Sequence, residues 1–351
     1  MTSYYLLPKG NIELSNCFKI EYLETGITPN ILSPSLNHYL LELQQNPRLN
    51  NPVFYKLQND IYPYFNKIIK TTNYCSEFFE ILEIIQTMHL NKYIETNIKT
   101  PLQIVSFEKN IHQNASSLAF QYIRTNNNNN NNNNIFQKDI FSFWNNEKYN
   151  IYSFEKIYLS FAAKNHIVIA NNTKCIDNKS ILIQMCMALC IQCKKGIFIW
   201  KIGDCYSQLS LEILFFLSSF YERIYIMKPS FMDISKSEKY IVCKGFLYEN
   251  SYSIYTYLHR FIKYIDTYTY NKQNQKQNIY RFLNINIPYF FVSKLEEINC
   301  ILGQIQLEQI NYLLLLLCHK YKDEKVQNII IQNEQKCIEW CRRNRFFVCF
   351  A

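Results

Sequence analysis

A lysine and a glutamate in the second half of the chain are the side chains best placed for chemistry. Lys201 directly follows a short apolar run at residues 197–200, and Glu238 lies just before a second run at residues 240–243. In open α/β sheets, ligands bind at the carboxyl ends of the strands, so we expect Lys201 to face such a crevice. Enzymes use both side-chain types for proton transfer. The alternative interpretation is an ordinary strand-end lysine and a surface glutamate.

Alternating strands and helices are expected around these two residues. Short apolar runs predict strands at residues 102–107, 167–170, 197–200, 224–227 and 240–243. Apolar residues spaced by three and four predict helices at residues 74–90, 115–124 and 179–194, and a further helix capped by Ser207 or Ser210. This order predicts an α/β fold with a mostly parallel, Rossmann-like sheet. The last two strands lie too close for a crossover and should form an antiparallel hairpin.

Three regions are expected along the chain. Residues 1–70, with prolines among short apolar clusters near the start, predict an irregular N-terminal arm. Residues 71–250 should form the sheet domain, interrupted by a disordered asparagine-rich insertion at residues 125–135. Residues 251–351 predict a helical C-terminal extension. The clearest helical segments of this extension are residues 295–318 and 326–340.

Composition narrows the class of protein. The formal net charge of +9 fits a polyanionic partner such as RNA, and it fits a solvated lysine surface equally well. The 13 cysteines are scattered and no secretory leader is apparent, so we expect free thiols in a reducing compartment, the cytoplasm. The apolar runs are far shorter than the roughly 20 residues of a membrane span. We therefore expect a soluble protein without a membrane partner.

The stretch of residues 196–246 carries a specific order of motifs. A glycine-led strand ends in a lysine, a helix follows, and a Lys-Pro, Ser-Glu, Tyr and Val pattern builds the final hairpin. The matching positions are Gly196, Lys201, Lys228, Pro229, Ser237, Glu238, Tyr240 and Val242. This pattern resembles the FtsJ-like and cap-type RNA ribose 2'-O-methyltransferases, and is most similar to members from large cytoplasmic DNA viruses. The resemblance implies a methyltransferase sheet and a place in a viral factory or virion.

The resemblance also implies a reaction. Members of this family methylate a ribose 2'-hydroxyl with S-adenosylmethionine, as in mRNA capping, and use a Lys-Asp-Lys-Glu tetrad. The hydroxyl oxygen must lie in line with the methyl group and lose its proton as the new bond forms. Carboxylates and a second lysine tune the pKa of the tetrad lysine. Lys201 matches the second lysine of the tetrad, and Glu238 matches its glutamate.

The two remaining tetrad positions carry other residues. The aspartate should follow the predicted strand at residues 167–170, where the sequence has Asn171 and Asn172 instead. Asparagine has the shape of aspartate without its charge, so it cannot shift a lysine pKa in the same way. Asp177 lies too far along the chain to replace it. The first lysine should lie on the helix at residues 74–90, where the alignment places Glu80.

The loop that should hold the cofactor is also degenerate. Family members follow their first strand with a glycine-rich turn, because only glycine lets the backbone approach the cofactor closely. Here no glycine occurs between residues 27 and 195. The residues at the loop positions are Lys109, Asn110, Ile111 and His112. We therefore expect no cofactor, although S-adenosylmethionine would be required if the protein is an active enzyme.

Two further groups of residues have competing interpretations. Four lysines of the predicted hairpin could hold RNA phosphates or could serve solubility alone; they are Lys228, Lys236, Lys239 and Lys244. Three cysteines at helical spacing could be imagined as metal ligands, but they have no partner pair at zinc-site spacing and are better explained as core residues; they are Cys186, Cys190 and Cys193. We expect no metal site.

The sequence thus leads to three hypotheses. The first is a protein of the methyltransferase fold with a degenerate active site, which serves as a non-catalytic RNA-binding or assembly subunit. The second is an active RNA 2'-O-methyltransferase with divergent motifs. The third is a structural protein that contacts a protein partner through its C-terminal helices.

Overall fold

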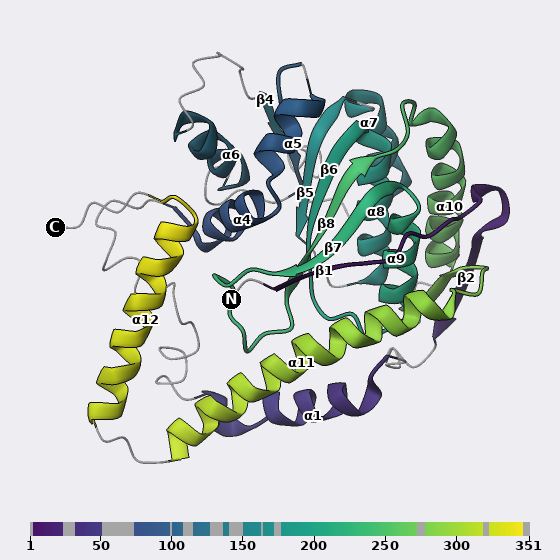
Figure 1. Cartoon of the computed structure of the whole chain (residues 1–351). Coiled ribbons are helices and arrows are strands. Elements are labelled where there is room, and N and C mark those ends of the chain that lie inside the picture. Colours follow the sequence, from purple (N-terminus) through teal and green to yellow (C-terminus); the bar gives the residue numbers. More distant parts are fainter. Residues whose placement is uncertain are drawn as a thin grey trace.

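The structure is a computed structural model of the whole chain (Figure 1). It describes residues 3–23, 32–50, 74–98, 100–107, 115–126, 136–139, 150–162, 164–171, 177–271, 278–318 and 323–346. The predicted cofactor loop at Lys109 to His112, Asn172 and most of the asparagine run lie outside the described residues.

A seven-stranded sheet forms the centre of the molecule, in the order β1-β7-β8-β6-β5-β3-β4. Its strands are β1 (Ser3–Leu6), β3 (Gln103–Ser106), β4 (Phe136–Asp139), β5 (Asn165–Asn171), β6 (Gln192–Ile202), β7 (Tyr221–Lys228) and β8 (Lys239–Phe246). Strands β4, β3, β5 and β6 pair in parallel, whereas β8 pairs antiparallel with both β6 and β7. The predicted α/β class, the mostly parallel sheet and the antiparallel hairpin are confirmed.

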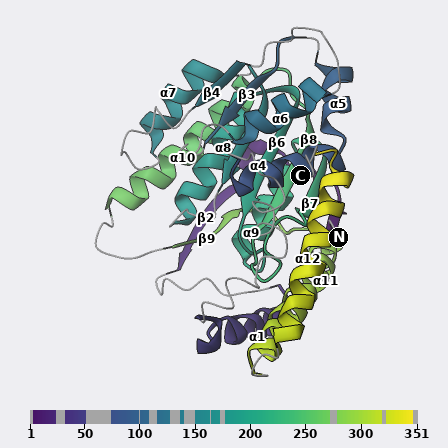
Figure 2. The same ribbon diagram turned by 90° about the vertical axis from the view of Figure 1, so that its left-hand side faces the viewer.

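Helices cover both faces of this sheet. Figure 2 shows α7 and α10 on one side and α5 and α12 on the other. The helices of the first face are α7 (Ile151–Phe161), α8 (Asn178–Ile191), α9 (Gln208–Ser218) and α10 (Tyr252–Asn271). The helices of the second face are α4 (Ser76–Thr87), α5 (Leu90–Asn97), α6 (Ala115–Asn126) and α12 (Asp323–Arg343). Each face therefore has its own apolar core.

Alternation along β6 decides which residues face which core. Phe198 and Trp200 are buried in the core of the α8 face. Ile197 and Ile199 are buried in the core of the α4 face. Because side chains alternate along a strand, Lys201 continues the row of Ile197 and Ile199 and faces α4.

Local signals in the sequence fix the start of the apolar run of β6 and the starts of two helices. A Cβ atom at Gly196 would lie 2.8 Å from the carbonyl oxygen of Cys193, so only glycine fits where β6 begins its apolar run. Ser207 caps α9 by accepting a hydrogen bond from the backbone N–H of Ser210 at 3.2 Å. Asp177 caps α8 in the same way. Asp177 is therefore engaged in a helix cap.

The N-terminal region is more regular than its prolines suggest. Its described elements are β1, a 3-10 helix (Leu14–Asn16), β2 (Phe18–Leu23), α1 (Pro34–Gln44) and a second 3-10 helix (Pro47–Asn50). Strand β1 pairs antiparallel with β7, at the edge of the sheet. The prediction of an irregular arm was therefore wrong for these elements, because tertiary pairing supplies the order that local sequence lacks. The domain boundaries at residues 70 and 250 stay predictions.

The C-terminal region is largely helical, as predicted. Helix α11 (Tyr289–Cys318) packs on α1, and a Cβ atom at Gly303 would lie 2.6 Å from the side chain of Leu36. In Figure 1 these two helices lie side by side below the sheet. A strand that the sequence did not predict, β9 (Asn278–Leu283), pairs antiparallel with β2. Among the described helices, none is long and apolar enough to cross a membrane.

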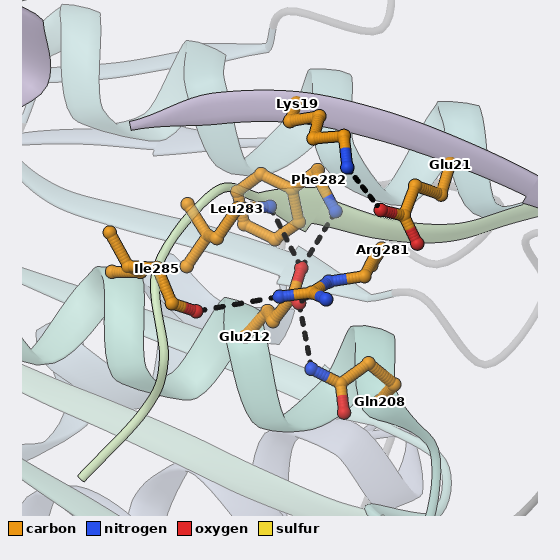
Figure 3. A network of polar contacts seen from close by, with 8 residues as sticks. All are labelled: Lys19, Glu21, Gln208, Glu212, Arg281, Phe282, Leu283 and Ile285. Carbon is orange, nitrogen blue, oxygen red and sulfur yellow. Dashed lines mark hydrogen bonds and ion pairs between the residues drawn. The ribbon is translucent and has the colours of Figure 1, made fainter. Parts of the chain in front are cut away.

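A buried glutamate fastens β9 to α9 (Figure 3). The Glu212 carboxylate accepts hydrogen bonds from the backbone N–H groups of Phe282 and Leu283, at 2.6 and 2.9 Å. It also accepts from Gln208 at 2.7 Å and from Arg281 at 3.0 Å. Four donors thus compensate the burial of this carboxylate, whose side chain is wholly inaccessible.

Candidate functional site

Three residues form a row across the carboxyl end of the sheet. Asn171 on β5 is the register partner of Lys201 on β6, and Lys201 is the partner of Tyr240 on β8. Directly opposed residues lie about 5 Å apart and project from the same face. The row therefore points toward α4, as the strand alternation requires.

The Lys201 ammonium is held by two carboxylates. Its Nζ lies 2.8 Å from Glu80 Oε2 and 3.6 Å from Glu238 Oε2. Tyr240 donates its hydroxyl hydrogen to the same Glu80 oxygen at 2.8 Å, and its ring centroid lies 5.6 Å from Lys201 Nζ. The Lys201 and Glu80 side chains are only 8% and 7% exposed. The structure thus brings together three predicted tetrad positions, and it buries the central ion pair.

The fourth predicted position lies beside them. Asn171 donates a hydrogen bond from its amide to Glu77 Oε1 at 3.3 Å. Glu77 lies one helical turn before Glu80 on α4, so both acids project from one side of that helix. The end of β5 therefore contributes an amide that is bonded to a carboxylate.

A third acid on the same stripe of α4 holds the loop after β7. Glu83 accepts hydrogen bonds from the backbone N–H and the hydroxyl of Ser230, at 2.7 and 2.8 Å, and from the backbone N–H of Phe231 at 3.1 Å. It also accepts from the indole N–H of Trp340 on α12 at 2.8 Å. Sequence reasoning missed Glu77 and Glu83. Their spacing of three from Glu80 on a predicted helix was the available signal.

Electrostatics keep Lys201 charged. Burial alone would lower its pKa, but the nearby Glu80 carboxylate, with smaller contributions from Glu238 and Glu77, outweighs burial. The net result is a pKa raised above the ordinary lysine value. Lys201 is therefore a charged hydrogen-bond donor and an ion-pair partner at neutral pH.

Two of the four hairpin lysines donate hydrogen bonds to backbone carbonyl oxygens at this edge of the sheet. Lys228 Nζ donates to the carbonyls of Lys236 and Glu238, at 2.7 and 2.6 Å. Lys239 is buried and donates to the carbonyl of Gly203 at 3.0 Å. Burial, together with the positive charge of Lys239, lowers the pKa of Lys228 to about 7. Both ammonium groups brace the hairpin, whereas the Lys236 side chain is exposed.

The fourth hairpin lysine lies elsewhere. Lys244 pairs with Ile197 at the start of the apolar run of β6, whereas Lys239 pairs with Ile202 at its end. The structure therefore does not bring the four lysines together, because five residues along an extended strand separate its two ends by roughly 17 Å. Their role in RNA binding stays a prediction.

The cysteines considered as metal ligands lie in the core. Cys186 and Cys190 are fully buried on α8, and Cys193 is partly buried on β6. Burial raises the pKa of the Cys193 thiol to about 11, which disfavours the thiolate form that a metal needs. Within the described residues, no group of three potential ligands is placed to hold a metal ion.

Comparisons with known proteins give partial matches to one kind of enzyme, although no family model matches the sequence. A cap-specific mRNA (nucleoside-2'-O-)-methyltransferase 1 of Trypanosoma cruzi is 34% identical over 79 residues, which are 22% of this chain and 22% of that protein. The protein of the same name from Homo sapiens is 33% identical over 75 residues, 21% of this chain and 9% of that protein.

One relative is named as inactive. The inactive cap-specific mRNA (nucleoside-2'-O-)-methyltransferase 1B of Caenorhabditis briggsae is 23% identical over 117 residues, which are 33% of this chain and 14% of that protein. The aligned part of this chain thus spans about a fifth of the trypanosomal protein and less of the animal proteins. With the α/β sheet, these matches support an RNA methyltransferase-like protein, related to the cap-specific 2'-O-methyltransferases.

Proposed function

We propose that this chain is a degenerate member of the FtsJ-like 2'-O-methyltransferases, with a Rossmann-like sheet, that does not transfer methyl groups. In this proposal it serves as a non-catalytic RNA-binding or assembly subunit. One observation carries the proposal: the lysine at the catalytic position forms a buried ion pair with a glutamate, at 2.8 Å.

The ion pair opposes the chemistry that the site would need. A lysine that accepts the proton of a 2'-hydroxyl must be neutral, and a base works best when its pKa lies near the working pH. A second lysine at the position of Glu80 would lower the pKa of Lys201 by repulsion between like charges. Glu80 instead raises it. With a pKa above the ordinary value near 10.5, less than about one Lys201 in a thousand is neutral at pH 7.

The neighbouring strand gives no compensating charge. Asn171 carries no charge, and its amide donates to Glu77. The glycine-free interval from residue 27 to residue 195 argues in addition against binding of S-adenosylmethionine, since a cofactor loop needs close backbone approach. The relative named inactive is a precedent for loss of activity among such proteins.

Isothermal titration with S-adenosylmethionine is the decisive experiment. We expect no binding at micromolar concentrations and no methyl transfer from labelled cofactor to a capped RNA. Micromolar binding together with transfer would overturn the proposal in favour of an active enzyme, and Lys201→Ala should then abolish the transfer.

A variant that restores the tetrad charges is the matched comparison. Glu80→Lys combined with Asn171→Asp replaces the acid by a base and adds the missing carboxylate. We expect this variant to lower the pKa of Lys201, because the new ammonium repels it. Direct titration of Lys201 by NMR, with 13C-labelled lysine, measures this shift without any need for catalysis. An unchanged pKa would contradict the electrostatic argument.

Binding experiments separate the remaining roles. Steeply salt-dependent binding of RNA would support the RNA-binding subunit, since phosphate contacts release counterions. A protein that binds no RNA but captures a partner through its C-terminal helices would be structural. A cytoplasmic or viral location, and a closer kinship to viral members, stay predictions.

A further inference from the structure

Two cations lie opposite each other at the amino-terminal edge of the parallel strands. Arg223 on β7 and Lys244 on β8 are register partners, so their side chains project from the same face about 5 Å apart. This edge is the opposite end of the sheet from Lys201, because Lys244 pairs with Ile197, four residues earlier on β6. At about 3.3 Å per residue the two places are roughly 13 Å apart along the strand.

The charge of this pair is not neutralised within the described part of the chain. Neither Arg223 nor Lys244 forms a hydrogen bond or an ion pair with another described residue, and Arg223 is exposed. The adjacent carboxylate, Glu222, is bound by Lys195. Like charges directly opposite each other destabilise a sheet. Consistent with this, burial and then the charge of Arg223 lower the pKa of Lys244, and the smaller opposing effect of the Glu222 carboxylate does not reverse this.

One contact positions Lys244 without cancelling its charge. Its Nζ lies 4.5 Å from the centroid of the Tyr93 ring on α5, a cation–π geometry. In Figure 1, α5 lies near the upper end of the sheet, whereas the start of the chain and the loop after β7 lie at the lower end. The ring holds the ammonium beside Arg223.

Three neighbouring cations are already used. Lys228 and Lys239 bind backbone carbonyls, and Lys201 binds Glu80. Within the described hairpin, Arg223 and Lys244 are therefore two adjacent cations that bind neither a carboxylate nor a carbonyl oxygen. The net charge of +9 favours a polyanionic ligand. Because the chain is related to mRNA methyltransferases, RNA is the polyanion that we expect.

We propose that Arg223 and Lys244 form a phosphate-binding surface for the RNA backbone, at the edge of the sheet opposite to the methyltransferase site. The guanidinium of Arg223 can donate two parallel hydrogen bonds to a phosphate, and the Lys244 ammonium adds a point charge. Such contacts bind RNA independently of its base sequence. The proposal rests on the proposed role in RNA binding, and it moves the contact from the predicted rim of four lysines to one end of the hairpin.

Fluorescence anisotropy with a labelled 20-nucleotide oligouridylate tests the surface, over a range of salt concentrations. The variant Arg223→Gln/Lys244→Gln is compared with Lys236→Gln, which removes an exposed charge from the other end of the same hairpin. Loss of two phosphate contacts should reduce the slope of log affinity against log salt by about 1.4, and affinity near 0.1 M salt by tenfold or more. Lys236→Gln should change the slope by much less.

Stability of the variants separates binding from folding. Because the relief of repulsion between Arg223 and Lys244 offsets the loss of the contact between Lys244 and the Tyr93 ring, the double variant should have a melting temperature close to that of the wild type. A lower melting temperature would mean that the pair is structural and would overturn the proposal. The single variant Arg223→Lys keeps the charge and should retain most of the salt slope.

The remaining outcomes separate a failure of the proposed phosphate-binding surface from a failure of the proposed function. An equal loss of affinity in Lys236→Gln, or a wild type that binds no RNA, would overturn the surface and leave the loss of catalysis untouched. Methyl transfer by the wild type would overturn the loss of catalysis. A selective loss in the double variant would still support the surface in that case.

Discussion

Two buried glutamates on opposite faces of the sheet have different partners. Glu212 on the α9 face binds two backbone N–H groups, Gln208 and the permanently charged Arg281. Glu80 on the α4 face binds only side chains, those of Lys201 and Tyr240. The first network fastens the chain, whereas the second joins residues at positions that the sequence resemblance assigns to a catalytic tetrad. Burial of a glutamate therefore does not by itself identify a functional site. The kind of group that donates hydrogen bonds to the glutamate is the better indicator.

Loss of the Glu212 network should have the largest effect. Glu212→Ala leaves the buried N–H groups of Phe282 and Leu283 without an acceptor and Arg281 without its carboxylate partner, although Arg281 still donates to the carbonyl of Ile285. We expect the free energy of unfolding in urea to fall by about 3–5 kcal/mol, the usual result of breaking a buried charged network. Glu21→Ala is the control, because its pair with Lys19 is exposed and should contribute less than about 1 kcal/mol. Equal effects of the two variants would remove the distinction between the networks.

Much of the frame around these networks could be predicted from sequence. Apolar runs predicted β3, β5, β6, β7 and β8, since buried strands are continuously apolar. The resemblance located Lys201, Glu238 and Glu80, which the structure brings together. Strand β1 could not be predicted, because it is ordered by pairing with β7, more than 200 residues later. The contact between Glu83 and Trp340, on helices α4 and α12, likewise has no local signal.

Position along a strand explains why the four hairpin lysines do not form one cluster. Lys239 and Lys244 lie five residues apart in the sequence and look like one cluster. In an extended strand these residues lie at opposite ends of the sheet, where one binds a carbonyl oxygen and the other faces Arg223. Proximity in sequence was therefore a poor guide to proximity in space at this hairpin.

Removal of the Glu80 charge should have the second largest effect. Glu80→Gln keeps the shape and an acceptor for Tyr240, but it leaves the Lys201 ammonium with only the more distant Glu238. We expect a loss of about 1–3 kcal/mol in the free energy of unfolding, smaller than for Glu212→Ala because no backbone group loses its partner. The double variant Glu80→Gln/Lys201→Met removes both charges and should recover part of this loss. A double variant less stable than Glu80→Gln would contradict the account of an unpaired buried charge.

Lys228 should make stability depend on pH near neutrality. Its folded pKa is about 7, well below the ordinary value of 10.5. Between these pH values the unfolded chain holds a proton that the folded chain has released, so this group makes the free energy of unfolding rise with pH. Below pH 7 the contribution becomes constant. Urea unfolding from pH 6 to pH 9 should show the rise in the wild type and a smaller rise in Lys228→Met, and identical profiles would contradict the lowered pKa.

The smallest predicted effect is a difference between the two glutamate networks in how their contribution to stability changes at alkaline pH. The folded pKa of Lys201 is raised, so the pair with Glu80 stabilises the protein fully below the unfolded pKa near 10.5 and is lost as pH rises through the folded pKa. Without Glu80, burial lowers the pKa of Lys201, so the difference in stability between the wild type and Glu80→Gln should be largest near neutral pH and narrow as the pH becomes alkaline. The difference between the wild type and Glu212→Ala should persist there, because Arg281 keeps its charge and the backbone donors do not titrate. A Glu80 difference that does not narrow as the pH becomes alkaline would mean that Lys201 contributes through packing, and its charge would then no longer support the proposed loss of a catalytic base.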